Sequence, residues 1–197
     1  LFYLESCPGK SDDNAFVVRA KFGQPNGAER AQYSTVSGIW MKKLIHWTFT
    51  QTDQGSITDY YTWPELRLAD LYLLTAECYN EIGKGDLAIY YLDLIRERAG
   101  LKGVEESWTK YSNNPNKFRN IEGLREIIHQ EREIELAFEG ERIWDLRRWK
   151  KAGDFQNKNA IGWNVKGKNA KEYYQPTILD EQIFVTPRDY LWPISIN

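Results

Sequence analysis

The stretch that decides the fold is Arg67–Leu101, RLADLYLLTAECYNEIGKGDLAIYYLDLIRERAGL, which holds two apolar helical patterns around a pair of glycines. Pro64 suits the first turn of a helix, where its missing N–H would have no partner, so we expect a helix over 64–82. This helix is apolar nearly all round, which predicts burial on several sides. Asp86 is a suitable N-cap for a second helix over 87–99. The two helices should form an antiparallel hairpin.

Small and large side chains alternate in this hairpin with the spacing of a tetratricopeptide repeat. Small residues let the two helices approach closely, and aromatic or aliphatic residues fill the space beside them. The positions that fit this spacing are Ala76, Tyr79, Gly83, Ala88, Leu92 and Ile95. Cys78 lies in the same apolar pattern and is expected to be a small core residue. One repeat cannot bury both of its faces. Either neighbouring repeats or other helices should therefore cover this one.

A second helical region is expected downstream, with a helix over 121–139, a glycine break, and a shorter helix over 141–151. Their apolar positions should be buried, namely Ile121, Leu124, Ile127, Ile128, Ile134, Phe138, Ile143, Trp144, Leu146 and Trp149. We expect Trp192 in the core as well, and a loop over 100–120. The chain is thus predicted to be all-α, with tetratricopeptide-like helical hairpins and long irregular loops.

Turn-forming residues dominate both ends of the chain. We therefore divide it into a loop-rich flank over 1–62, a helical core over 63–151 with one tetratricopeptide-like hairpin, and an irregular C-terminal segment over 152–197. That last segment is expected to pack on the core, with Leu191–Ile194 as an extended stretch.

The second helical region contains several closely spaced glutamates, which could indicate a catalytic site. They are Glu131, Glu133, Glu135, Glu139 and Glu141. Two carboxylates across a bound sugar could serve a glycosidase. Interleaved arginines favour ion pairs instead, for example Arg132–Glu135 and Arg142–Asp145. Arg67, Asp70 and Glu77 share one side of the first helix, and we expect partners among the arginines of 142–148. No catalytic residue is predicted.

Composition excludes several classes of function. A net charge of −2 offers no basic field for nucleic acid. Two histidines and two cysteines without paired spacing indicate no metal site, and no glycine-rich phosphate loop or other cofactor motif is present. Eight Trp and twelve Tyr are more than a small core needs, so some aromatic side chains are available for stacking on a ligand.

Four motifs occur in the order of one family. They are RLADLYLLTAECYNEIG (67–83), YLDLIRERAGL (91–101), EREIELAFEGERIWDLRRW (131–149) and LWPI (191–194). With them, the chain resembles the C-terminal part of a SusD/RagB-family protein. The resemblance is firm over about 63–151 and looser over 187–194.

The resemblance implies a function that is not enzymatic. SusD-like proteins of Bacteroidetes are outward-facing lipoproteins of the outer membrane. They bind oligosaccharides or polysaccharides and cover a SusC-like TonB-dependent transporter, which takes up the nutrient. The implied membrane contact is a lipid anchor upstream of these residues. The family's motifs here are scaffold motifs and carry over no sugar-binding residue.

Loop aromatics are our candidates for glycan binding, because the apolar face of a sugar stacks on an aromatic ring. They are Tyr33, Trp40 and Trp47, which lie in the loop-rich flank outside the periodic core. The alternative is a helical-repeat module for protein interaction, whose main ligand is the partner transporter.

Overall fold

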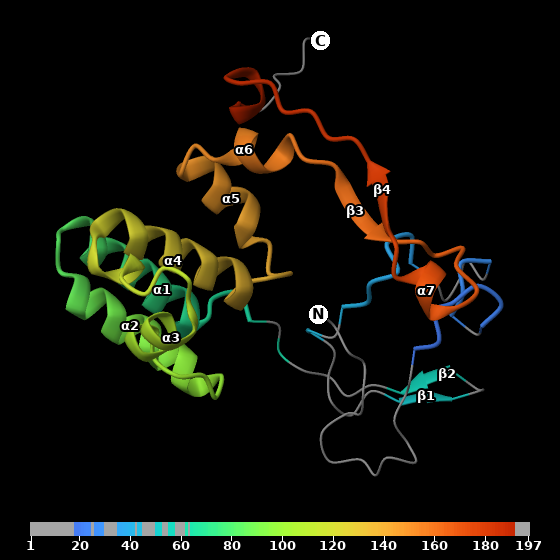
Figure 1. Ribbon diagram of the computed structural model, residues 1–197, viewed down its shortest axis with the longest axis horizontal. Helices are drawn as coiled ribbons and strands as arrows, with labels where there is room; N and C mark the ends of the chain where they lie inside the picture. Colours follow the sequence, from blue (N-terminus) through green and yellow to red (C-terminus); the bar gives the residue numbers. More distant parts are fainter. Residues whose placement is uncertain are drawn as a thin grey trace. The chain divides into compact units, whose positions relative to one another are not determined.

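The computed structural model describes residues 18–24, 26–29, 35–41, 43–44, 50–52, 55–57, 62 and 64–191. The chain forms two compact units (Figure 1). The helical unit is Thr62–Asp145, and the loop-rich unit combines Leu1–Tyr61 with Leu146–Asn197. The fold is all-α in character, with tetratricopeptide-like helices and long irregular segments, as the sequence predicts.

Two helices of equal length form the predicted hairpin, α1 (Leu68–Glu81) and α2 (Gly85–Arg98). Helix α1 begins later than expected because Arg67 has an extended backbone and occupies the N-cap position. The small and aliphatic positions of the repeat are buried, at Ala76, Ala88, Leu92 and Ile95. The tetratricopeptide spacing is therefore confirmed.

The predicted loop over 100–120 is wrong, because it contains helix α3 (Val104–Tyr111) and the 3-10 helix η2 (Lys117–Arg119). The backbone N–H of Val104 donates to a carboxylate oxygen of Asp93 on α2, at 2.7 Å. This bond satisfies one of the free amides with which a helix begins. A side chain of another helix thus caps the start of α3, and Glu105 and Glu106 in its first turn are the local signal that the sequence analysis did not use.

Helix α4 (Ile121–Glu135) packs against α1, as Figure 1 shows. Leu124, Ile127 and Ile128 are buried as expected. Ile134 is 63% exposed and Phe138 also lies outward, so the prediction of their burial is wrong. The helix ends at Glu135 and the backbone of Phe138 is left-handed, which takes Phe138 off the buried face, whereas Ile134 lies within the last turn of the helix on its exposed side.

Helix α5 (Glu141–Arg148) follows the glycine break. Its Leu146 is buried, whereas Trp144 is 55% exposed, so the core position predicted for Trp144 is wrong. Trp149 is half-buried, and Trp192 lies outside the described residues.

The buried guanidinium of Arg132 joins three helices of the helical unit. Its Nε lies 2.8 Å from Asp145 of α5, and its Nη1 lies 2.8 Å from Asp70 of α1. Asp70 therefore pairs with α4, and the expected partner among the arginines of 142–148 is wrong. Arg132 is only 2% exposed, so it faces the interior and not the helix surface where a pair with Glu135 would form.

Four of the five crowded glutamates form ion pairs with arginines, namely Glu131, Glu133, Glu135 and Glu139. The ion pairs are Arg96–Glu131, Arg142–Glu133, Arg67–Glu135, Arg98–Glu135 and Arg67–Glu139. Most of them join different elements, so these carboxylates hold the helical unit together.

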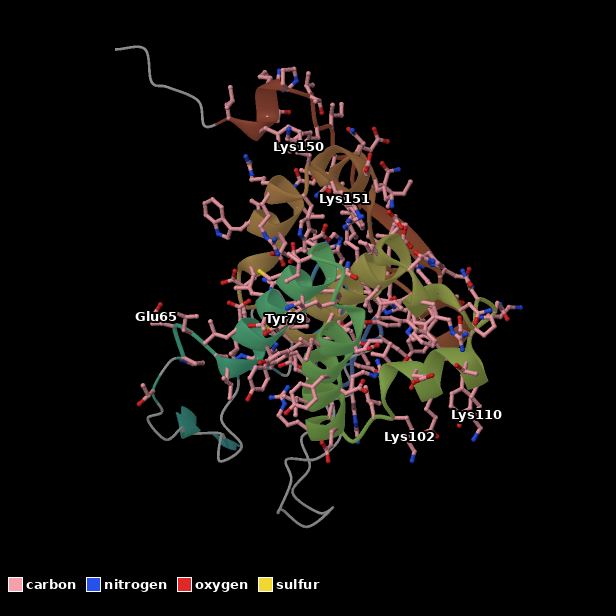
Figure 2. The ribbon with its side chains drawn as sticks, turned by 90° about the vertical axis from the view of Figure 1, so that its left-hand side faces the viewer. Glu65, Tyr79, Lys102, Lys110, Lys150 and Lys151 are labelled. Carbon is pink, nitrogen blue, oxygen red and sulfur yellow. The ribbon has the colours of Figure 1, made fainter. Side chains whose placement is uncertain are left out.

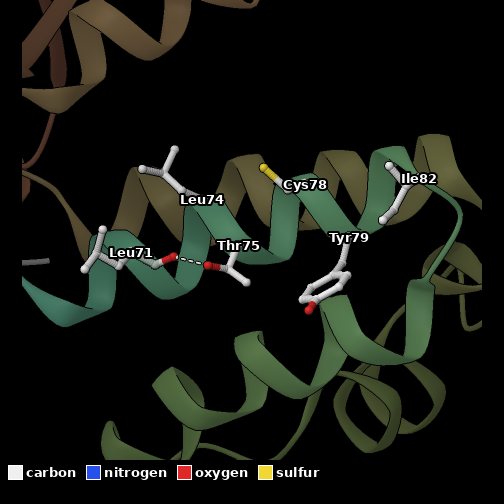
Figure 3. Close-up of a pocket in the computed structure, with 6 residues that line it drawn as sticks. All are labelled: Leu71, Leu74, Thr75, Cys78, Tyr79 and Ile82. Atoms are coloured by element: carbon white, nitrogen blue, oxygen red, sulfur yellow. Dashed lines mark hydrogen bonds between the residues drawn. The ribbon is translucent and has the colours of Figure 1, made fainter.

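One face of α1 is open, which corrects the expectation of burial on several sides. A shallow groove of about 300 Å³ runs along this face. Figure 3 shows the side chains that line it, Leu71, Leu74, Thr75, Cys78, Tyr79 and Ile82. Cys78 is an exposed free thiol there and not a core residue. Within the described residues, α2 and α4 cover only the sides of α1 that carry Leu73 and Ala76.

The loop-rich unit contains short elements. Strands β1 (Thr50–Thr52) and β2 (Gly55–Ile57) pair antiparallel. Helix α6 (Ala152–Gln156) precedes strand β3 (Ala160–Trp163), which pairs antiparallel with β4 (Pro176–Asp180). The short helix α7 (Ala170–Tyr173) lies in the connection, and the 3-10 helix η3 (Arg188–Tyr190) follows β4. The β3–β4 hairpin is an element that the sequence did not predict.

None of the helices in the described part of the chain has the length and apolar character needed to cross a membrane.

Candidate functional site

Of the three aromatic residues predicted to bind glycan, the structure describes one. Trp40 is half-buried in the segment 35–41 of the loop-rich unit. Tyr33 and Trp47 lie outside the described residues.

The segment that carries Trp40 is attached to β3 and α7 by two hydrogen bonds. The backbone N–H of Trp163 donates to the carbonyl of Ser37 at 2.9 Å, and the Tyr173 hydroxyl donates to the carbonyl of Gly38 at 3.1 Å. Burial raises the pKa of Tyr173, so its hydroxyl stays protonated as this bond requires. Trp40 follows Gly38 by two residues, so these bonds position the backbone that leads to it.

Gly38 makes this attachment possible. Its φ of +67° is a left-handed conformation that glycine adopts without steric cost. A Cβ at this position would lie 2.7 Å from the Tyr173 hydroxyl and 3.1 Å from the Cβ of Trp163. Only glycine lets the segment approach the two aromatic side chains so closely.

Three aromatic side chains gather at the end of β3. The rings of Trp163 and Tyr174 meet edge to face with centroids 5.5 Å apart, and those of Tyr173 and Tyr174 do so at 5.3 Å. Tyr173 is buried beneath, whereas Tyr174 is 55% exposed and Trp163 is half-buried. In this aromatic cluster, Trp163–Tyr173–Tyr174, the rings of Trp163 and Tyr174 are therefore partly exposed to solvent and pack on the buried Tyr173 or on each other.

Sequence reasoning missed Trp163 and Tyr174 because it searched only the N-terminal flank for loop aromatics. The signal was available, since the same criterion of aromatic residues among Asn, Gly and Lys applies to 157–175.

The turn between β3 and α7 presents polar groups beside the cluster and is held by its own hydrogen bonds. The backbone N–H of Asn164 donates to the carbonyls of Tyr173 and Gln175, each at 3.0 Å. Asn169 caps α7 by accepting from the N–H of Glu172. The backbone N–H of Lys168 and the amide of Asn169 donate to the Glu172 carboxylate, and these bonds lower its pKa. The turn thus combines amide and charged groups in a defined backbone conformation.

A shallow pocket lies on the same turn. It has a volume of about 400 Å³ and is lined by Phe22, Ala28, Glu29, Lys166 and Lys168. The backbone N–H of Phe22 donates to the carbonyl of Gly167 at 3.0 Å, which joins the segment 18–24 to the turn. The Phe22 ring is 41% exposed. We name this the Phe22 pocket.

The aromatic cluster and the Phe22 pocket share the chemistry of a sugar-binding surface. Exposed rings bind the apolar face of a sugar, and amide or charged groups nearby bind its hydroxyls. Among the described residues, no group of three or more His, Cys, Asp or Glu side chains is arranged to hold a metal ion.

The sequence model of the SusD family matches residues 15–197. The chain belongs to the SusD family. The match covers both the helical unit and most of the loop-rich unit, so the two units occur together in this family.

Individual SusD relatives agree with this assignment. SusD-like protein P2 of Formosa agariphila is 36% identical over 130 residues, which are 66% of this chain and 22% of that protein. SusD-like protein P25 of the same organism is 39% identical over 90 residues, covering 42% of this chain and 14% of the relative. The chain therefore spans less than a quarter of the length of these SusD-like proteins.

Two solved structures share the fold. A SusD-like protein from Bacteroides fragilis NCTC 9343 matches 66% of this chain and 22% of its own, with a TM-score of 0.51 and 32% identity. The solved protein BT4246 matches 81% of this chain and 26% of its own, with a TM-score of 0.66 and 29% identity.

Proposed function

We propose that this chain is part of the glycan-binding component of a SusCD-type uptake complex, and that it binds the glycan without catalysis. The observation that supports the proposal most is the aromatic cluster Trp163–Tyr173–Tyr174, fixed to the Trp40 segment in a member of a family that generally binds glycans.

In this proposal, binding uses stacking and hydrogen bonds from the loop-rich unit. Trp163 and Tyr174 take the apolar face of a sugar ring, and Trp40 serves a neighbouring ring. The side chains of the turn, among them Lys166 and Lys168, bind hydroxyl or acidic groups at the edge of the sugar. Tyr33 and Trp47 remain candidates for glycan binding.

The partner is a SusC-like TonB-dependent transporter, and the location is the outer face of the outer membrane, reached through a lipid anchor upstream. Family membership supports both proposals. The bound oligosaccharide is the cargo of the transporter, which explains why binding without turnover is sufficient.

The ion-paired glutamates support a role without catalysis. Glu131 pairs with Arg96, and Glu135 pairs with both Arg67 and Arg98. Both carboxylates are thus engaged in ion pairs between segments of the helical unit, which is a structural role and not that of a general acid. We expect Glu131→Gln to leave glycan binding unchanged.

The test is a glycan array probed with the full chain, followed by titration of any bound glycan with intrinsic Trp fluorescence as the signal. We expect binding of one glycan class, at least tenfold weaker binding by Trp163→Ala, and a smaller loss by Trp40→Ala. Turnover of a glycan that is abolished by Glu131→Gln would contradict the proposal.

A second function, protein recognition, is favoured by the open groove on α1. Leu71, Leu74 and Ile82 form an apolar strip on a tetratricopeptide-like helix, and such helices normally stack against a further helix. The strip fits an amphipathic helix. The reaction of Cys78 with a thiol reagent would show whether the groove is occupied. A bound helix would slow this reaction, because Cys78 is exposed in the open groove.

A further inference from the structure

Positive charge is concentrated between the end of α6 and the first turn of α7. Residues 158–171 include four lysines and no Asp or Glu, although the whole chain has a net charge of −2. The lysines are Lys158, Lys166, Lys168 and Lys171. A cationic stretch of this kind attracts anionic ligands, because the fields of neighbouring ammonium groups add.

Two of these lysines line the Phe22 pocket, on either side of Gly167. The Nζ of Lys168 lies 5.9 Å from the centroid of the Phe22 ring. Within the described residues, neither Lys166 nor Lys168 forms an ion pair with a carboxylate. Both lysines are exposed beside an aromatic face, and Lys168 also interacts electrostatically with the nearby Glu172.

The nearby carboxylates already accept hydrogen bonds from the backbone. Glu29 accepts from the N–H of Gly23 at 2.6 Å, and Glu172 accepts from the N–H of Lys168 at 3.0 Å. Among the residues lining the pocket, two ammonium groups face one carboxylate. The lining therefore carries a net positive charge.

We propose that the Phe22 pocket binds an acidic sugar residue, so that the glycan recognised by this chain carries carboxylate or sulfate groups. The inference rests on the proposed function and specifies its ligand class. The apolar face of the sugar ring lies on Phe22, and its anionic group lies between the ammonium groups of Lys166 and Lys168. A carboxylate and a sulfate ester have the same chemistry for this purpose, since both offer anionic oxygens to ammonium donors.

Binding at an exposed cationic site depends on salt, because mobile ions screen exposed charges. We expect affinity for an acidic glycan to fall when the ionic strength rises from about 0.05 to 0.5 M, while affinity for its neutral counterpart stays nearly constant.

The experiment is calorimetric titration of the full chain with matched pairs of oligosaccharides. One pair is hexagalacturonate and its methyl-esterified form, and the other is a sulfated carrageenan hexasaccharide and its desulfated form. We expect the acidic member of one pair to bind about tenfold more tightly than its neutral partner, a difference that two charge-assisted contacts can supply. The pair that shows the preference identifies the anion.

The decisive variant is Lys166→Gln/Lys168→Gln, which should bring the acidic and neutral glycans to equal affinity. The matched control is Lys102→Gln/Lys110→Gln, which removes the same charge from the helical unit, where Figure 2 shows both side chains projecting away from the helices. The control should keep the preference. Neither double variant removes a backbone hydrogen bond, so both should fold.

Four results would overturn the inference. Equal binding of acidic and neutral glycans by the parent chain, or a preference that survives Lys166→Gln/Lys168→Gln, would contradict the acidic ligand and leave the proposed function intact. Binding to phosphatidylglycerol vesicles with the same lysine dependence, and no glycan preference, would assign the pocket to an anionic surface. Failure to bind any glycan, charged or neutral, would contradict the proposed function itself.

Discussion

The hydroxyl of Tyr173 donates a hydrogen bond to the carbonyl of Gly38, 135 residues earlier in the chain. This bond and the one between the N–H of Trp163 and the carbonyl of Ser37 join two segments of the loop-rich unit that have no common helix or strand. The aromatic cluster and the backbone leading to Trp40 therefore depend on each other for their position.

Removing this hydroxyl should loosen the candidate site. In Tyr173→Phe the buried carbonyl of Gly38 loses its partner, and we expect a loss of about 1–2 kcal/mol of stability in the loop-rich unit. Hydrogen–deuterium exchange should increase in 35–41, and glycan affinity should fall. Tyr111→Phe is the control, because Tyr111 is an exposed side chain of the helical unit. Unchanged exchange in 35–41 would show that the bond does not hold the segment.

The backbone of the polar turn packs on α7 without room for a side chain at Gly167. An added Cβ would lie 2.4 Å from the backbone N of Tyr173. We expect Gly167→Ala to cost about 1–3 kcal/mol, as overpacking generally does, and to weaken glycan binding. Urea denaturation followed by near-ultraviolet circular dichroism, which reports on aromatic packing, would measure this loss of unfolding free energy.

Gly85→Ala is the matched control for this substitution. Its Cβ would meet only Leu124, at an ordinary 3.7 Å, so stability should be unchanged or higher by about 0.5 kcal/mol. Equal effects of the two glycine substitutions would argue against close packing of the turn on α7.

Arg132 should be essential for the stability of the helical unit. Its replacement by Ala leaves the carboxylate of Asp145 buried without its partner in α4, and we expect a loss of about 3–5 kcal/mol. Arg125→Ala removes an exposed pair with Glu81 and should cost only about 0.2–1 kcal/mol. Urea unfolding followed by far-ultraviolet circular dichroism compares the two. A cost below that of Arg125→Ala would refute the structural role of the Arg132 network.

The Glu81–Arg125 pair between α1 and α4 gives a pH dependence with a defined sign. Hydrogen bonds from Arg125 lower the pKa of Glu81 below its ordinary 4.5. Since the folded pKa lies below the unfolded one, the stabilisation is present above pH 4.5 and is lost as the pH falls through the folded pKa.

This sign can be checked by comparing the parent chain with Arg125→Gln. The difference in unfolding free energy, about 0.2–1 kcal/mol for an exposed pair, should be present at neutral pH and shrink on acidification. A difference that grows as the pH falls would contradict the role of the ionised pair.

The local part of the fold could be predicted from the sequence, and the part that depends on distant contacts could not. The spacing of Ala76, Ala88 and Leu92 predicts the hairpin because neighbours three or four residues apart share a helix face. The start of α3 depends on Asp93, a side chain of another helix, and the short pattern of 104–111 could not indicate that contact.

The same distinction applies to the candidate site and to α1. The aromatic residues of loop-rich segments indicated that the chain could stack on a ligand. The contact of Gly38 with Trp163 and Tyr173 could not be predicted, because these residues lie far apart in the sequence. Hydropathy marked α1 as apolar on every side. It could not indicate that the face with Leu71 and Ile82 would stay open among the described residues.

The most direct test is an NMR titration of the tryptophan indole N–H signals in the full chain with the glycan identified by array binding. We expect the signals of Trp163 and Trp40 to shift with the same affinity that calorimetry gives, while Trp108 of the helical unit stays unchanged. Saturable shifts of Trp108 with Trp163 and Trp40 unaffected would place the glycan on the helical unit and contradict the proposed site.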